Sequence, residues 1–187
     1  PWFKCRARDQ FIALPGLTLS IEEQDYFELV METAAKGLRE FMEGKPLSVK
    51  IYEMEKPDVP LWCVWAIQQY AKEAGKERCR KLYMDLIRDI VDYLLASKHP
   101  NLTLDTNGLL YADAKGEAIT WMNSMNNGQP VVPRSGYIVE FNALWYNALR
   151  FTAAMEMESG NEGRANELDA LAEKCKVSFV ETFLNEY

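Results

Sequence analysis

The chain carries six stretches with helical hydrophobic patterns, and two kinds of stretch alternate along it. Residues 11–19, 59–70 and 141–155 are apolar on nearly every side, whereas residues 22–42, 78–95 and 161–184 have one apolar and one charged face. A helix that is apolar all round must be surrounded by other elements, and a two-faced helix covers a core from outside. The alternation therefore predicts an all-α fold in which inner helices are wrapped by outer helices.

The links between these stretches differ in length. Each inner stretch passes to the next outer stretch through a short link, whereas two long loops, about residues 43–58 and 98–138, return from outer to inner stretches. Long loops at one end of a rigid scaffold usually carry the function. Within the second loop, residues 102–111 are centred on an Asn107-Gly108 pair, which predicts a small β-hairpin.

The size and charge of the chain limit the classes of function. Its 187 residues have the size of one domain, and we treat residues 1–187 as a single domain. A net charge of -7 argues against a nucleic-acid partner, since phosphate binding needs clustered Lys and Arg. No apolar run approaches the roughly 20 residues of a membrane span, so we expect no membrane partner either.

Cysteine and histidine usage indicates carboxylate chemistry. Cys5, Cys63, Cys79 and Cys175 are far apart, which favours buried free thiols in a reducing, cytoplasmic compartment over disulfides or a metal site. His99 is the single histidine, which removes a Ser-His or Cys-His triad and any His-based metal site. Any chemistry must therefore rest on carboxylates, and because a carboxylate mechanism needs no metal or organic cofactor, we expect neither.

Residues 119–149 combine an aromatic and polar loop, a Pro-Arg turn and a helix rich in Trp and Tyr. A saccharide site needs flat faces for stacking and several fixed hydrogen-bonding groups, and this run supplies both. The run resembles the glycogen debranching enzymes, in the amylo-α-1,6-glucosidase domain that cleaves the α-1,6-linked glucose stub. That family reads roughly Thr-Trp-Met-Asp, then Thr-Pro-Arg, then a helix with a Glu followed by Asn-Ala-Leu-Trp-Tyr-Asn.

Two further segments, residues 8–19 and 58–62, resemble family motifs in the same order and extend the resemblance over essentially the whole chain. The resemblance implies an α/α toroid of six helical hairpins, the six-hairpin glycosidase type. Three hairpins are visible here, so we expect about half of the ring, as a fragment of a larger glycosidase-like domain. Half a ring leaves an uncovered apolar edge, which predicts either self-association or cover by a missing half.

Asn123 is the main departure from the family pattern. Glycoside hydrolysis normally uses two carboxyl groups, and the resemblance implies that the general acid is an Asp at position 123 and the base a Glu beyond residue 187. The Asn123 amide cannot give up a proton on demand. We expect the chain alone to be inactive, as part of a debranching-like hydrolase for α-1,6 branches of glycogen-type glucans. The alternative is a non-catalytic glucan-binding relative; a plain helical interaction module would leave the motif unexplained.

Four charged side chains are further candidates, each with a functional and a purely structural interpretation. Glu140 is either a substitute carboxylate or a supporting group of the site, or simply a first-turn Glu favoured by the helix dipole. Arg134 either binds a sugar hydroxyl or braces the loop through a salt bridge. The resemblance implies that Arg8 and Asp9 grip glucose hydroxyls, whereas the residues alone permit a helix-capping Asp9 and a surface pair for Arg8.

Three tryptophans and one amide complete the candidate substrate-binding residues, with an α-glucan as the expected partner. Trp62, Trp121 and Trp145 are candidate stacking platforms for sugar rings, although plain core packing is the favoured reading for any one of them. Trp121 lies within the long loop and is the strongest of the three. Asn142, in the helix that follows, is the candidate hydrogen-bonding amide.

Overall fold

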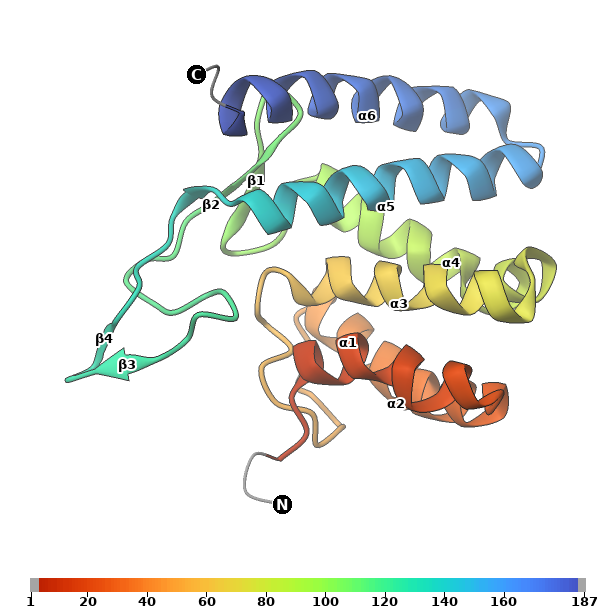
Figure 1. Ribbon diagram of the computed structural model, residues 1–187, viewed down its shortest axis with the longest axis horizontal. Helices are drawn as coiled ribbons and strands as arrows, with labels where there is room; N and C mark the ends of the chain where they lie inside the picture. Colours follow the sequence, from red (N-terminus) through yellow and green to blue (C-terminus); the bar gives the residue numbers. More distant parts are fainter. Residues whose placement is uncertain (1–3, 185–187) are drawn as a thin grey trace. The chain divides into compact units, whose positions relative to one another are not determined.

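The computed structural model describes residues 4–184, and within them six α-helices account for most of the chain (Figure 1). The helices are α1 (Ala7–Thr18), α2 (Gln24–Met42), α3 (Val59–Ala74), α4 (Lys76–Leu95), α5 (Val139–Glu158) and α6 (Glu162–Phe183), with a short 3₁₀ helix η1 (Leu19–Ile21) after α1. The strands are β1 (Leu102–Leu104), β2 (Leu110–Ala112), β3 (Met125–Asn126), β4 (Gln129–Pro130) and β5 (Gly136–Tyr137). The predicted all-α class is confirmed, and each predicted helix is present.

The chain divides into two compact units, unit 1 (Pro1–Ile90) and unit 2 (Val91–Tyr187). The boundary falls within α4, so α1, α2 and α3 belong to unit 1, and α5, α6 and the strands to unit 2. The half-toroid and the single partial domain stay predictions. No helix in residues 4–184 combines the length and the apolar character that crossing a membrane would require.

The core of unit 1 is built around α3. No side chain of α3 from Val59 to Ala71 is exposed, as predicted for a surrounded helix. Phe27 of α2 stacks on Tyr70 of α3 with ring centroids 4.9 Å apart, and Tyr83 of α4 meets Tyr70 edge to face at 5.3 Å. This aromatic cluster joins the three helices through their buried faces.

The first helix differs from its prediction in two ways. It begins at Ala7, four residues before the predicted stretch, because Arg8 is buried by an ionic partner that an apolar pattern cannot reveal. It is also two-faced rather than apolar all round, since Ile12 and Leu17 are 38% and 70% exposed. The alternation of helix types is therefore incomplete at α1.

In unit 2, α5 and α6 form a helical hairpin, the sheet of β1, β2 and β5 lies beside the N-terminal end of α5, and the β3–β4 hairpin projects away from it (Figure 1). The predicted β-hairpin is confirmed: β1 pairs antiparallel with β2, and β5 extends the sheet along the other edge of β2. Gly108 has φ +86 at the turn, and an added Cβ would lie 3.2 Å from the backbone nitrogen of Cys175. Glycine is required there for both reasons.

Candidate functional site

The motif residues of unit 1 meet at the start of α3. The Arg8 guanidinium forms a two-pronged ion pair with Asp58, with Nε to Oδ2 at 2.6 Å and Nη2 to Oδ1 at 2.8 Å. Both side chains are buried, with exposed fractions of 5% and 3%. Asp58 Oδ2 also accepts a hydrogen bond from the Trp62 indole Nε1 at 3.1 Å. One carboxylate therefore links α1 to the first turn of α3.

This arrangement changes the expected role of Arg8 and Asp9. Arg8 is directed at Asp58, whereas Asp9 lies exposed in the first turn of α1. The structure thus joins Arg8 to Trp62 through Asp58 and leaves Asp9 outside the cluster. The buried Arg8 guanidinium is bound to Asp58 and is not positioned to bind a sugar hydroxyl together with Asp9. Sequence reasoning placed Asp58 within a motif but did not assign it a chemical role.

In unit 2, the predicted Arg134 and Glu140 form a pair at the N-terminal end of α5. Arg134 Nη2 donates to Glu140 Oε2 at 2.8 Å, and Nη1 donates to the other carboxylate oxygen. Glu140 occupies the first turn of α5, where the helix dipole favours a carboxylate. The loop-bracing reading of Arg134 is therefore observed. The side chains remain 21% and 25% exposed, so contact with a ligand is compatible with the pair.

Asn142 and Trp145 are fully buried and hold the β-hairpin on α5. Asn142 Oδ1 accepts from the Leu110 amide at 2.7 Å, and its Nδ2 donates to the Leu110 carbonyl at 3.1 Å. The Trp145 indole Nε1 donates to the Gly108 carbonyl at 3.2 Å. Both residues have an exposed fraction of 0%. Trp145 thus presents no ring face for stacking, and the structure gives both residues a positioning role in place of direct sugar contact.

The loop that contains Trp121 and Asn123 lies between β2 and β3. Trp121 is 61% exposed, so it offers the open ring face that Trp145 lacks. Asn123 is half-buried two residues further on, and the Thr120 hydroxyl fixes the preceding turn by accepting from the Met122 amide at 3.2 Å. The loop therefore presents an aromatic face and an amide close together in sequence.

Asp105 is a carboxylate at the hairpin turn that sequence reasoning did not select. The Tyr137 hydroxyl donates to its Oδ2 at 2.5 Å, and the Thr106 amide donates to its Oδ1 at 2.5 Å. The hydrogen bond from Tyr137, followed by those from Thr106, holds the pKa of Asp105 below its ordinary value. A carboxyl group that stays ionised cannot supply a proton, so Asp105 does not replace an acid at position 123.

The cysteines match the predicted free thiols with one exception. Cys63, Cys79 and Cys175 are buried, whereas Cys5 is exposed. Burial raises the pKa of Cys175 to about 11 and that of Cys79 to about 12. Both thiols are therefore protonated and unreactive at neutral pH. Within residues 4–184, no three His, Cys, Asp or Glu side chains are grouped as metal ligands.

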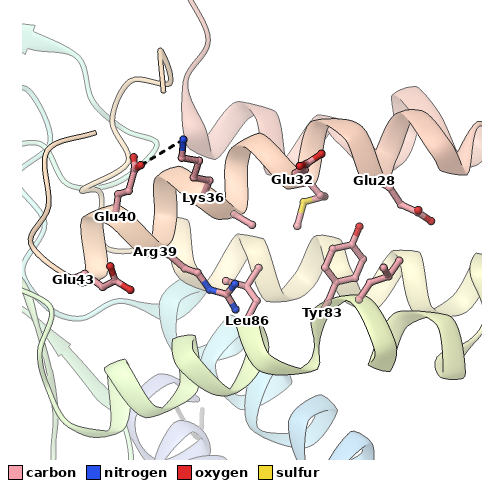
Figure 2. Close-up of a pocket in the computed structure, with 11 residues that line it drawn as sticks. Glu28, Glu32, Lys36, Arg39, Glu40, Glu43, Tyr83 and Leu86 are labelled. Atoms are coloured by element: carbon pink, nitrogen blue, oxygen red, sulfur yellow. Dashed lines mark ion pairs between the residues drawn. The ribbon is translucent and has the colours of Figure 1, made fainter. Parts of the chain in front are cut away.

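Unit 1 also has a groove of about 590 Å³ between α2 and α4, away from the motif residues (Figure 2). Glu28, Glu32, Lys36, Glu40 and Glu43 extend along its α2 side, facing apolar side chains of α4. Several of these charges are already paired, as Lys36 is with Glu40 at 4.0 Å. None of the predicted site residues lines the groove, so the concavity does not coincide with the motif clusters.

Comparison with known proteins gives one match. Residues 1–187 match a family model described as amylo-alpha-1,6-glucosidase. The search of curated proteins found no match, and neither did the search of solved structures.

Proposed function

The chain belongs to the amylo-alpha-1,6-glucosidase family, and from this premise we propose that it binds glycogen-type α-glucans at α-1,6-linked glucose branches. The family match over residues 1–187 is the observation that carries the proposal. In unit 2, Trp121 offers an open ring face in the loop between β2 and β3, and the Arg134–Glu140 pair offers hydrogen-bonding groups at the N-terminal end of α5.

The chemistry at position 123 decides whether binding leads to turnover. Hydrolysis requires a proton donor for the leaving oxygen, and the Asn123 amide cannot serve as one. Both carboxylate oxygens of Glu140 are engaged by Arg134 in a two-pronged ion pair. Asp105 has a lowered pKa. We therefore propose that the chain itself binds glucan without hydrolysing it.

Glucose release from a glycogen limit dextrin tests this proposal. The chain should remain at background, and an Asn123→Asp variant of the full-length protein should gain activity of about 100- to 10,000-fold over the natural protein. Asn123→Gln is the matched control, since it keeps the amide. Asn126→Asp adds a carboxylate to an exposed position of the same loop and should leave activity at background. Turnover by the natural chain well above background would contradict the proposed inactivity.

The second candidate function is a non-catalytic glucan-binding protein, and Asn123 is the observation that favours it. In that case, the natural full-length protein binds branched glucan and releases no glucose. Turnover by the natural full-length protein would exclude this candidate, whereas turnover that appears only in the Asn123→Asp variant would identify Asn123 as the lost general acid. Absence of saturable glucan binding in both proteins would exclude both functions.

We further propose that the chain self-associates and that it acts in the cytoplasm. Exposed apolar side chains at the end of α1, in η1 and at the start of α2 support self-association: Leu17, Ile21, Tyr26 and Leu29 are each 60–70% exposed. Sedimentation at increasing concentration should show dimers or larger species, and a strict monomer would contradict the first proposal. The three buried free thiols agree with a reducing compartment; cell fractionation tests the second.

A further inference from the structure

Stabilisation of the fold does not by itself explain the buried Arg8–Asp58 ion pair. Both side chains are at least 95% buried, and removing two charges from water costs free energy that their attraction repays only in excellent geometry. Well-packed apolar residues of similar volume often stabilise a fold at least as well. The role of the pair therefore depends on which side chain it holds in position.

Asp58 is not used in the way its position in the chain suggests. It is the N-cap residue of α3, where an aspartate side chain normally accepts from the first free amides of the helix. Its side chain makes no such cap bond. Its oxygens instead accept from Arg8 and from the Trp62 indole. The carboxylate thus fixes a side chain of α3 rather than the end of the helix.

Trp62 is held from two sides. Its indole N–H is bound by Asp58 at 3.1 Å, and its ring meets Trp65 edge to face with centroids 5.5 Å apart at 85°. The Trp62 side chain is only half-buried. An aromatic ring that is both fixed and partly open is a preformed stacking surface, because little rotamer freedom remains to be lost when a ligand binds.

We propose that Asp58 is a positioning residue that, locked by Arg8, holds the Trp62 indole as a stacking platform for a glucose ring. This proposal rests on the proposed function, since it names where a glucan chain contacts unit 1. The apolar face of the sugar stacks on the indole, and its hydroxyls remain available to polar groups and water. Arg8 is too deeply buried to be the main ligand contact, so it acts through Asp58.

The decisive variant removes the pair without leaving a lone charge. In Arg8→Met/Asp58→Leu, apolar side chains fill the same space, and the thermal midpoint should stay within about 5 °C of the natural protein. Affinity for a maltooligosaccharide bearing one α-1,6-linked glucose, measured by titration calorimetry, should fall about tenfold because the indole is no longer held.

The matched control is Arg39→Met/Asp89→Leu. Arg39 and Asp89 form an Arg–Asp pair in the same unit with the same sequence separation, but their side chains are 40% and 52% exposed. This control should keep full affinity. If the Arg8/Asp58 double variant does not fold, Trp62→Phe provides the test: it keeps an aromatic ring, loses the N–H held by Asp58, and should weaken binding about two- to tenfold.

The outcomes separate the inference from the function on which it rests. Weaker binding with an unchanged thermal midpoint supports a positioning role. Unchanged affinity in a folded Arg8/Asp58 double variant, or in Trp62→Phe, overturns the inference while the proposed function stands. Absence of binding by the natural chain overturns the proposed function, and the inference with it.

Discussion

Two arginine–carboxylate pairs, one in each unit, are both two-pronged but lie in different surroundings. Arg8 and Asp58 in unit 1 are 5% and 3% exposed, whereas Arg134 and Glu140 in unit 2 are 21% and 25% exposed. Both pairs come from segments that resemble family motifs. The buried pair is costly to break and remote from solvent, and the other pair is cheap to break and open to a ligand. Burial, rather than residue type, decides which role an ion pair can take.

The largest expected effect is that of breaking the buried pair on one side. Asp58→Ala leaves the Arg8 guanidinium buried without its carboxylate, which should lower the free energy of unfolding by about 3–5 kcal/mol. Urea denaturation followed by circular dichroism measures the loss. Asp89→Ala, at the exposed Arg39 pair, should cost about 0–1 kcal/mol. Equal losses of unfolding free energy in Asp58→Ala and Asp89→Ala would show that burial does not set the cost of breaking an ion pair.

Asn142, a buried neutral side chain in unit 2, tests whether the loss of a buried hydrogen-bonding group is costly when no charge is involved. Asn142→Ala leaves the Leu110 amide and carbonyl without their side-chain partner. The expected cost is roughly 1–3 kcal/mol for each stranded group, because it is desolvated without a hydrogen bond. Denaturation of Asn142→Ala measures this cost, with Asn126→Ala, which alters an exposed residue of β3, as the control. If Asn142→Ala lost less unfolding free energy than Asn126→Ala, Asn142 would not be needed to hold the β1–β2 hairpin on α5.

A smaller effect is expected at the half-exposed pair. Glu140→Gln keeps the size of the side chain and removes its charge, so the free energy of unfolding should change by about 1 kcal/mol or less. Salt sharpens the comparison: in 1 M salt, where the screening length is about 3 Å, this difference should shrink, whereas the loss in Asp58→Ala should persist. If the loss of unfolding free energy in Glu140→Gln did not depend on salt, the Arg134–Glu140 pair would behave like the buried Arg8–Asp58 pair.

The smallest effect at neutral pH comes from the buried thiols, which are alike in both units. Burial raises the pKa of Cys79 to about 12 and of Cys175 to about 11, from an ordinary value of 9.0. The folded state therefore keeps protons that the unfolded state loses above pH 9. Stability from these groups is full below pH 9 and is lost as pH rises toward 11 and 12. Denaturation midpoints at pH 8, 9 and 10 should be level and then fall; a rise above pH 9 would contradict this sign.

Periodicity in the sequence was enough to place most of the secondary structure. The apolar stretches of α2 to α6 repeat at helical spacing, and the Asn107-Gly108 pair supplies the positive-φ residue that a tight hairpin turn needs. The start of α1 was missed because Arg8 and its polar neighbours carry no apolar period. Trp121 was singled out because it lies in the long loop, and its ring is exposed in the structure; its role as a stacking platform stays a prediction.

The partners of the candidate side chains could not be predicted in the same way. Arg8 and Asp58 are 50 positions apart, and local spacing carries no information about which side chains meet across that distance. The sequence by itself determined the family and the helical class, because these depend on residue identity and short-range pattern. Only the tertiary structure decided that Arg8 is committed to Asp58, that Trp145 is sealed in a core and that Trp121 is open, because burial arises when distant segments pack together.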